Sequence, residues 1–241
     1  MRFNGTDPET IHHAVSVNKE IYPSTPDTDI AVVETTEGDL VANVNIRGSE
    51  ATIRLNIAAR TYDEAMEARL AIAEWAAGRR NRTAELEPTH LPGKAYGAIL
   101  DRITPVEQRF APVDVVFMLP RPILHETTVR KISGTGTQLT FRTGGSAPTA
   151  PALEITTEED TQELWLEVDG VKVFAIGGGV NAGQNVSYDM KTGRTTVDGA
   201  SAENRILYVD INPDAELLPG KHTLTTSTAG TLTVRWQNEW L

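Results

Sequence analysis

The chain has 241 residues, which is enough for one large domain or two of ordinary size. Its composition, 39% hydrophobic and 23% charged, is that of a globular protein, and its net charge is -11. A surface that binds duplex DNA tightly needs clustered Lys and Arg to replace the counterions of the phosphates, so this charge argues against specific DNA binding. The chain has no cysteine, which excludes disulfides, thiolate zinc sites and a cysteine nucleophile.

The sequence also argues against a membrane protein. No segment approaches the ~18 consecutive apolar residues that a membrane-spanning helix requires. The first residues lack the apolar core of a signal peptide. We therefore expect synthesis in the cytoplasm and no insertion into a membrane.

The first 57 residues have the pattern of short strands. An Asn4-Gly5 turn follows Phe3, and two prolines place a loop at residues 23–27. Apolar and polar residues then alternate at 29–34, 39–45 and 51–57, as they do in half-buried strands. A short glycine-containing loop at 47–50 predicts that the last two of these segments form a hairpin.

One amphipathic helix is predicted over residues 61–78. Thr61 precedes Glu64 by three residues, which is the spacing of a capping box, and acidic residues occupy the first turn. Met66, Leu70, Ala73 and Ala76 follow at helical spacing, with Tyr62 and Trp75 nearby, and are expected to form the apolar face. Gly78 ends the helix.

The sequence predicts two domains, residues 1–125 and residues 126–241. Strands are expected within 85–104 and at 111–119, after which Pro120-Arg121-Pro122 fixes an extended connection. From residue 126 onward, glycine-rich turns separate short alternating segments without a helical pattern, which is typical of an antiparallel β-sandwich. The predicted fold class is mainly β: an N-terminal β domain with one α-helix, and a C-terminal antiparallel β-sandwich.

No motif predicts an active site. His12 and His13 are adjacent, so on a strand they would point to opposite faces, and no pair of histidines has metal-ligand spacing. Glu163 and Glu167 lie on one strand about 13 Å apart at ~3.3 Å per residue, too far for glycosidase chemistry unless the chain bends. We therefore predict no catalytic residue, no metal and no cofactor, and hence that the protein is not an enzyme.

Two tryptophans are candidate contact residues. Trp165 alternates with Leu164 and Leu166, so it is expected on the outer face of the sandwich, and Trp240 lies at the end of the chain. An outer tryptophan covers a sugar, a neighbouring subunit or another domain. A carbohydrate-binding module of a host-adsorption apparatus is therefore the alternative function, and a glycoside hydrolase is the least favoured one.

Several segments, in this order along nearly the whole chain, resemble the siphovirus tail component family, the distal tail proteins of long-tailed, non-contractile phages. These segments are Phe3-Asn4-Gly5, the helix with Ala68-Arg69-Leu70 and Trp75, residues 91–101 (LPGKAYGAILD), 117–122 (FMLPRP), 144–155 (GGSAPTAPALEI), 188–193 (YDMKTG), 218–222 (LPGKH) and 234–236 (VRW). The order and spacing of the segments carry the resemblance, since no single one is specific.

The resemblance implies a structural role at the tip of a virion tail. Members of the family form a hexameric ring through the N-terminal domain and carry an outer galectin-like sandwich. The implied partners are further copies of the chain, in one ring or in stacked rings, the major tail tube protein, the tail fibre or spike, and receptor-binding proteins. DNA would pass through the central channel without being specifically bound.

The ring contact is expected in the hairpin at residues 39–57. Strand edges there would leave unpaired backbone groups, and packing on a neighbouring subunit would cover them. The candidate ring-contact residues are Val44, Ile46, Arg47, Ile53, Leu55 and Ile57.

Overall fold

The computed structural model describes residues 1–23, 28–35, 38–46, 48–77, 82–104, 112–208, 211–213 and 215–241, with the backbone alone at 28–46. The chain divides into two compact units, residues 1–125 together with Leu241 (unit 1) and residues 126–240 (unit 2). Among the described residues, no helix is both long enough and apolar enough to cross a membrane.

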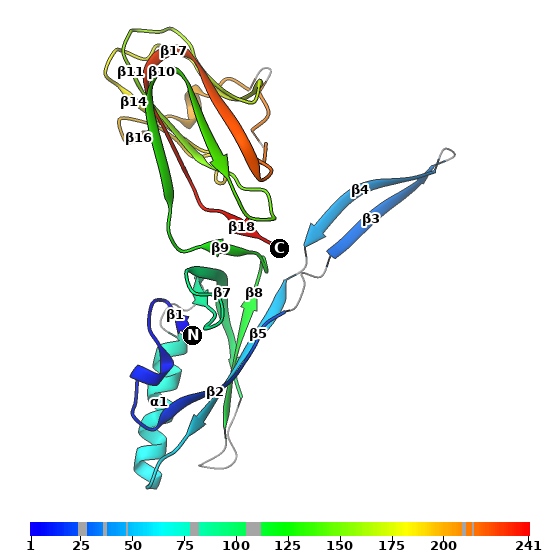
Figure 1. Cartoon of the computed structure of the whole chain (residues 1–241), viewed down its shortest axis with the longest axis vertical. Coiled ribbons are helices and arrows are strands. Elements are labelled where there is room, and N and C mark those ends of the chain that lie inside the picture. The colour runs from blue at the N-terminus through cyan, green and yellow to red at the C-terminus, as the bar shows by residue number, and fades with distance from the viewer. Residues whose placement is uncertain are drawn as a thin grey trace. The chain divides into compact units, whose positions relative to one another are not determined.

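Unit 1 is an antiparallel sheet covered on one face by a single helix (Figure 1). Its strands follow the order β1-β6-β7-β8-β5-β2. The elements of this unit are β1 (Arg2–Phe3), the 3-10 turn η1 (Pro8–Thr10), β2 (Val15–Ile21), β3 (Thr28–Thr35), β4 (Gly38–Ile46), β5 (Ser49–Ile57), α1 (Tyr62–Ala77), β6 (Ala84–Glu87), β7 (Lys94–Ile103), β8 (Val113–Leu119) and β9 (Leu124–Glu126), which continues into unit 2.

The core of unit 1 lies between α1 and the sheet. The Trp75 ring of α1 packs edge-on against Phe3 at 5.9 Å and Phe117 at 6.1 Å between ring centres. Its indole N–H also donates to the carbonyl of Thr6 at 3.1 Å, which satisfies the one polar group of this side chain. Aromatic burial from three separate segments therefore fixes the helix on the sheet.

The predicted capping box at the start of α1 is confirmed in one of its two hydrogen bonds. The Glu64 amide donates to Thr61 Oγ1 at 3.2 Å, and the Glu64 carboxylate accepts from the Arg60 amide at 2.6 Å. The first bond satisfies a backbone donor of the first helical turn, whereas the second goes to the residue before Thr61 and so differs from the reciprocal bond of a capping box.

The predicted apolar face of α1 is wrong in part. The buried residues are Ala65, Ala68, Ile72, Trp75 and Ala76. Three large residues that were expected in the core are instead exposed: Tyr62 at 56%, Met66 at 37% and Leu70 at 60%. The buried side of the helix combines three alanines with Ile72 and Trp75, so the other large residues lie on the outward side.

The predicted pairing of residues 39–45 with 51–57 is also wrong. β4 pairs with β3 as a two-stranded sheet of their own, with Ile30 opposite Val44 and Thr35 opposite Gly38. β5 lies between β2 and β8, and both of its edges are hydrogen-bonded. It therefore has no free edge, because its alternating apolar residues place it in the middle of the core sheet.

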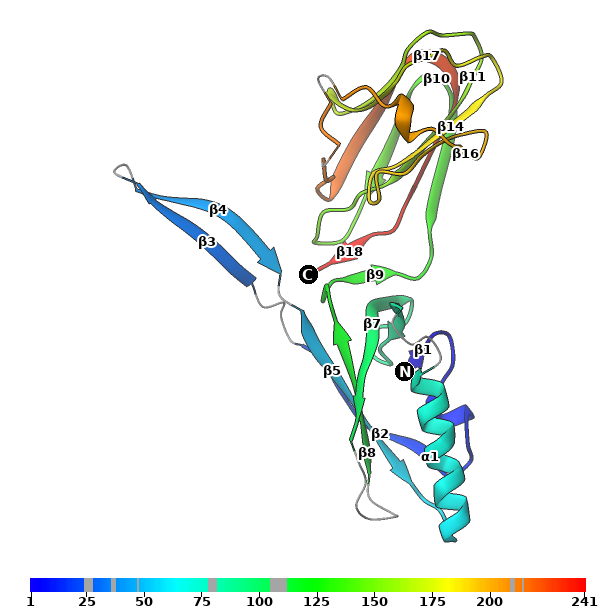
Figure 2. The ribbon, with the colours of Figure 1, turned by 180° about the vertical axis from the view of Figure 1, so that it is seen from behind.

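Unit 2 is a curled antiparallel sheet that folds into a sandwich (Figure 2). Its strand order is β13-β12-β17-β11-β14-β15-β16, and β10 pairs with β17. The elements of this unit are β10 (Arg130–Thr143), β11 (Ala152–Thr157), β12 (Leu164–Val168), β13 (Val171–Ile176), β14 (Asn185–Asp189), β15 (Thr195–Val197), β16 (Ala200–Ser201), the 3-10 turn η2 (Glu203–Arg205), β17 (Gly220–Trp236) and β18 (Glu239–Trp240).

The long strand β17 connects the two layers of the sandwich. Along one edge it pairs with β10, while its other edge pairs first with β12 and then with β11. Leu164 and Leu166 of β12 and Leu232 and Val234 of β17 are fully buried, as the alternation of the sequence predicts. The predicted fold class, mainly β with one helix and an antiparallel sandwich, is confirmed.

Candidate interaction surfaces

Three of the six candidate ring-contact residues have described side chains, and all three lie in the core of unit 1. Val44 and Ile46 belong to β4, whereas Arg47 lies outside the described residues. Ile53, Leu55 and Ile57 are buried in the core of unit 1. The side chains of these three residues pack inside their own unit, so they are not exposed to a neighbouring subunit.

Tyr62, Met66 and Leu70 form an exposed line along α1, which we call the outer stripe. Their spacing of four residues puts them on one side of the helix, away from its buried alanines. Exposed Asp63, Glu67 and Glu74 carry negative charge on the same helix. Three large apolar side chains in line are typical of a contact surface. The sequence showed the helical spacing of these three residues, but it led us to expect them in the core rather than on the surface.

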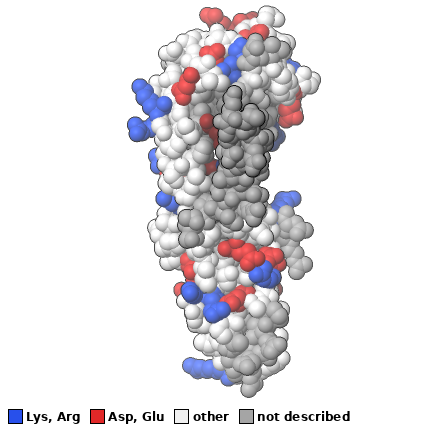
Figure 3. Space-filling view, turned by 90° about the vertical axis from the view of Figure 1, so that its right-hand side faces the viewer, with Lys and Arg blue, Asp and Glu red and all other residues white. Residues whose placement is uncertain are grey.

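The face of the unit 1 sheet opposite α1 carries paired charges. Arg54 Nε and Nη2 each donate to a different oxygen of the Asp114 carboxylate at 2.7 Å, and Arg102 makes a similar double contact with Glu50 at 3.0 Å. Arg102 also pairs with Asp101. Figure 3 shows acidic and basic side chains next to one another on this unit.

Each of these arginines is neutralised by a carboxylate. Hydrogen bonds from Arg54 and Arg102 hold the pKa values of Asp114 and Glu50, respectively, below their ordinary range. Both carboxylates therefore stay charged at neutral pH. Arg54 and Arg102 are therefore both occupied by carboxylates and are not free to bind the phosphates of DNA.

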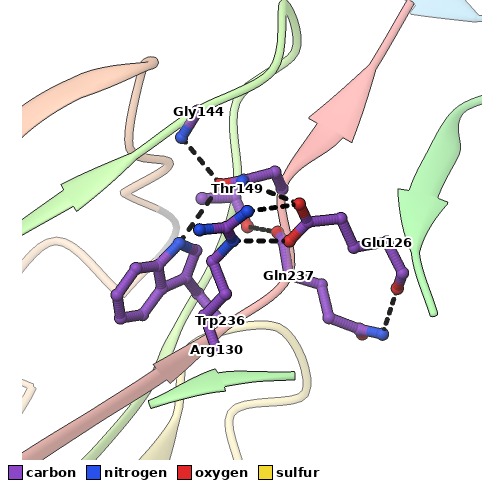
Figure 4. A network of polar contacts seen from close by, with 7 residues as sticks. Glu126, Arg130, Gly144, Thr149, Trp236 and Gln237 are labelled. Carbon is purple, nitrogen blue, oxygen red and sulfur yellow. Dashed lines mark hydrogen bonds and ion pairs between the residues drawn. The ribbon is translucent and has the colours of Figure 1, made fainter. Parts of the chain in front are cut away.

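Seven residues at one end of unit 2 form a polar network that we call the clasp (Figure 4). It joins the segment entering unit 2 to the segment that follows β17. Its members are Glu126, Arg130, Gly144, Thr149, Trp236, Gln237 and Asn238.

Asn238 is the buried centre of the clasp. Its side-chain oxygen accepts from the Gly144 amide at 2.7 Å and from the Trp236 indole at 3.2 Å, and its side-chain nitrogen donates to Glu126 at 3.2 Å. Arg130 binds both oxygens of Glu126 at 2.7 Å, and its hydrogen bond is the main reason that the pKa of Glu126 is lowered. The clasp therefore holds both ends of the unit 2 chain together.

A glycine beside the clasp is required by the close approach of two segments. Gly145 has φ of +94°, and an added Cβ would lie 1.9 Å from the carbonyl oxygen of Glu239. That carbonyl accepts hydrogen bonds from the amides of Ser146 and Ala147 at 3.0 and 3.1 Å. Any larger residue at 145 would separate these segments.

The buried side chain of His222 contacts the carboxylate of Asp169, which is about half exposed. Its Nδ1 lies 2.7 Å from the Asp169 carboxylate, and its Nε2 lies 2.8 Å from the carbonyl oxygen of Leu218. Both ring nitrogens of His222 therefore have a hydrogen-bond partner within the unit. Burial acts to raise the pKa of Asp169, but hydrogen bonds from His222 and the Thr223 amide outweigh it and lower the pKa.

Thr143 completes an Asp-His-Thr series, which invites comparison with a hydrolase triad. Its hydroxyl lies 3.0 Å from His222 Nε2, donates to the Leu218 carbonyl at 3.0 Å and accepts from the Gly220 amide at 3.2 Å. The residue is only 2% exposed. The group therefore ties β10, β17 and the turn after β12 together, and its hydroxyl is not presented to a substrate.

The two candidate tryptophans lie on separate strands. Trp165 is half-buried on β12, and the Lys172 ammonium lies 5.8 Å from the centre of its ring. One face of the ring is thus taken by a cation–π contact. Trp240 is half-buried on β18.

The rest of the described part of the chain holds few groups that could bind a ligand. Within it, no three His, Asp or Glu side chains are placed to hold a metal ion. An open hollow of about 470 Å³ lies beside β2, lined among others by Glu9, Lys19, Glu20 and His90. Glu20 is engaged there by the amide and hydroxyl of Thr89 at 3.1 and 2.7 Å.

Both the sequence and the fold resemble known proteins. Residues 144–240 match the sequence model of the siphovirus-type tail component, C-terminal domain. No curated protein matches the chain in sequence. The fold is similar to the crystal structure of Dit (gp 19.1) of phage SPP1, described as a paradigm of the hub adsorption apparatus in phages that infect Gram-positive bacteria, with a TM-score of 0.78 and 13% identity.

That similarity covers 100% of this chain and 98% of the SPP1 protein. Two structures of the phage P2 baseplate in its activated conformation, with Ca and with Sr, have TM-scores of 0.47 and 0.48 at 8% and 10% identity. They cover 93% and 92% of this chain and 90% of the baseplate chain in each case. The resemblance to the siphovirus tail component family is thus confirmed: residues 144–240 match its C-terminal domain, and the whole chain has the fold of a distal tail protein.

Proposed function

We propose that the protein is a structural, non-enzymatic hub at the tip of a phage tail. Six copies form a ring between the major tail tube protein and the tail fibre or spike, and receptor-binding proteins dock on it. The central channel lets DNA pass. The protein is made in the host cytoplasm and resides in the virion tail.

The whole-length fold similarity carries this function. The fold similarity extends over 100% of this chain and 98% of the SPP1 hub protein, so both units have a counterpart in that protein. The family match of residues 144–240 supports the same function independently through sequence.

The charges of the chain suit a conduit that does not retain DNA. The net charge is -11, and the arginines Arg54 and Arg102 are held by carboxylates on the sheet of unit 1. Phosphates are attracted by free cations and repelled by net negative charge. DNA would therefore meet no surface here that binds it tightly.

Carbohydrate binding is disfavoured as the function of unit 2. Stacking on a sugar requires an open aromatic face, and Lys172 occupies one face of Trp165. We propose instead that Trp165 and Trp240 contact partner proteins, as half-buried tryptophans often do.

Electron microscopy of virions labelled with antibodies against the purified chain tests the proposed function. We expect label at the end of the tail distal to the head. Label along the whole tube, or on the capsid, would contradict a tail-tip hub. Antibodies depleted on the purified protein provide the control.

A further inference from the structure

Two pairs of cations face one another across the long β10–β17 ladder of unit 2. Lys131 lies opposite Arg235 near one end of the ladder, and Arg142 lies opposite Lys221 near the other. All four residues are exposed. Directly opposed residues of an antiparallel pair point to the same face, so each pair places two positive charges side by side, with Cβ atoms about 5 Å apart.

The first pair has a counter-charge within the chain. Glu154 lies on β11, which pairs with β17 along the edge that β10 leaves open. Its two carboxylate oxygens bind Arg235, at 2.9 Å from Nη1 and 3.0 Å from Nη2. Such a double contact between a guanidinium and a carboxylate is among the stronger polar contacts in proteins. The fold therefore supplies an acid at this end of the ladder.

The second pair has no such counter-charge. Within the described residues, no carboxylate forms an ion pair with Arg142 or Lys221. Asp169 lies beside β17 there, but its two oxygens already contact His222 and the Thr223 amide. Like charges directly opposite one another destabilise a sheet. An anion from outside the chain would therefore stabilise this end of the ladder.

Two hydroxyl groups lie next to the second pair. Thr140 and Thr223 are opposite one another and two residues along their strands from the cations, so they share the same face at ~3.3 Å per residue. Neither hydroxyl has a hydrogen-bond partner in the part of the chain that the structure describes. The face thus combines a guanidinium, an ammonium and two hydroxyls, all of which can donate hydrogen bonds.

We propose that Arg142 and Lys221, with the hydroxyls of Thr140 and Thr223, bind a phosphate group on the exposed face of unit 2. A phosphate monoester carries a charge of about −1.5 to −2 at neutral pH, which matches two cations, whereas a carboxylate carries a single charge. Arginine binds two phosphate oxygens at once, which leaves further oxygens for the ammonium and the hydroxyls.

This site goes beyond the structural role of the protein and does not depend on ring assembly. It is also compatible with a channel that lets DNA pass. Proteins hold duplex DNA through many phosphate contacts, and a site for one phosphate adds only one of them.

The linewidth of the phosphorus NMR signal of inorganic phosphate, titrated with the full chain at neutral pH and constant ionic strength, tests the site. Bound phosphate tumbles with the protein, so its signal broadens. We expect Arg142→Gln and Lys221→Gln each to weaken binding by about fivefold or more, and the double variant to abolish the broadening. Lys131→Gln removes an exposed lysine from the other end of β10 and should leave the broadening unchanged. Equal broadening by the unmodified protein and the double variant would overturn the site.

Competition identifies the anion that the site prefers. Glycerol phosphate, a monoester, should displace inorganic phosphate at a similar concentration. Its failure to do so would show that the site takes the free ion and not the phosphate of a larger molecule. Acetate should not displace phosphate even at about ten times the concentration, because it carries half the charge. Displacement by acetate as effective as that by the monoester would overturn the assignment to phosphate and indicate a site for carboxylates.

Thermal unfolding gives a second readout. A ligand that binds only the folded state stabilises it, so phosphate should raise the unfolding temperature of the unmodified protein and of Lys131→Gln. The double variant at Arg142 and Lys221 should show a smaller rise. Phosphate also stabilises proteins in general by its exclusion from their surface. An equal rise in all three proteins would reflect that general effect and contradict a specific site.

Discussion

Neighbouring residues of β5 have opposite roles. Ile53 and Leu55 are fully buried against the helix side of the sheet, whereas Arg54 between them pairs with Asp114 on the exposed face. The alternation was readable from the sequence, but it did not reveal which face meets a partner. Burial within the chain's own core and burial against a neighbour leave the same apolar pattern.

Leu55→Ala should lower the free energy of unfolding by about 2–5 kcal/mol, because it removes buried volume that the packed core cannot refill. Urea unfolding followed by circular dichroism measures this loss. Arg54→Ala is the control and should change stability far less, since exposed ion pairs contribute little. Equal losses from the two variants would contradict the assignment of β5 to the core.

Asp169 should make unit 2 sensitive to acid. Its pKa is lower in the folded chain than in the unfolded chain, so its pairing stabilises the fold above the ordinary aspartate pKa, and this stability is lost as pH falls through the lowered value. Asp169→Asn should reduce stability at pH 7 and flatten the decline of stability below about pH 4.

Urea unfolding at a series of pH values from 2 to 7 checks this expectation. Glu159→Gln, at an exposed carboxylate of the same unit, should leave the curve of the unmodified protein unchanged. If stability falls with decreasing pH in the same way with and without Asp169, the contact with His222 does not contribute to acid sensitivity.

At the scale of elements, α1 shows what the sequence could and could not predict. Its existence and its capping box followed from local chemistry, and its described bounds, Tyr62–Ala77, lie within the predicted range. Its buried face could not be predicted in the same way. Large apolar side chains suggested burial, whereas three of the five buried residues are alanines. Tertiary packing thus overrode the simple apolar pattern.

The hairpin was assigned to the wrong pair of strands for a related reason. Two possible turns, at 35–38 and at 47–50, flank β4, and strand periodicity alone cannot choose between them. The choice depends on β2 and β8, which take both edges of β5 from distant parts of the sequence. Local sequence does not contain that information.

The clasp should be essential to unit 2. Asn238→Ala leaves the Gly144 amide and the Trp236 indole without their acceptor, at a cost of about 1–3 kcal/mol for each donor that stays buried. Thermal or urea unfolding of the full chain, monitored by tryptophan fluorescence, measures the loss. Thr231→Ala, at an exposed position of β17, is the control and should stay within about 0.5 kcal/mol.

At the scale of the whole molecule, the sequence predicted the fold class and the resemblance to distal tail proteins, and both are confirmed. The order of strands in the two sheets did not follow from the sequence, since β17 alone pairs with β10, β11 and β12 across long separations. The clasp and the Asp169–His222 pair were missed for the same reason, as their members come together only in the folded chain. No short motif marks them.

The mass of the purified protein in solution tests the central claim most directly. Light scattering, with negative-stain images of the same peak, should give a particle of six chains of 26.2 kDa, about 157 kDa, with a central hole. A stacked pair of rings would double that mass. A particle that remains at the mass of a single chain at high protein concentration would contradict a ring-forming hub.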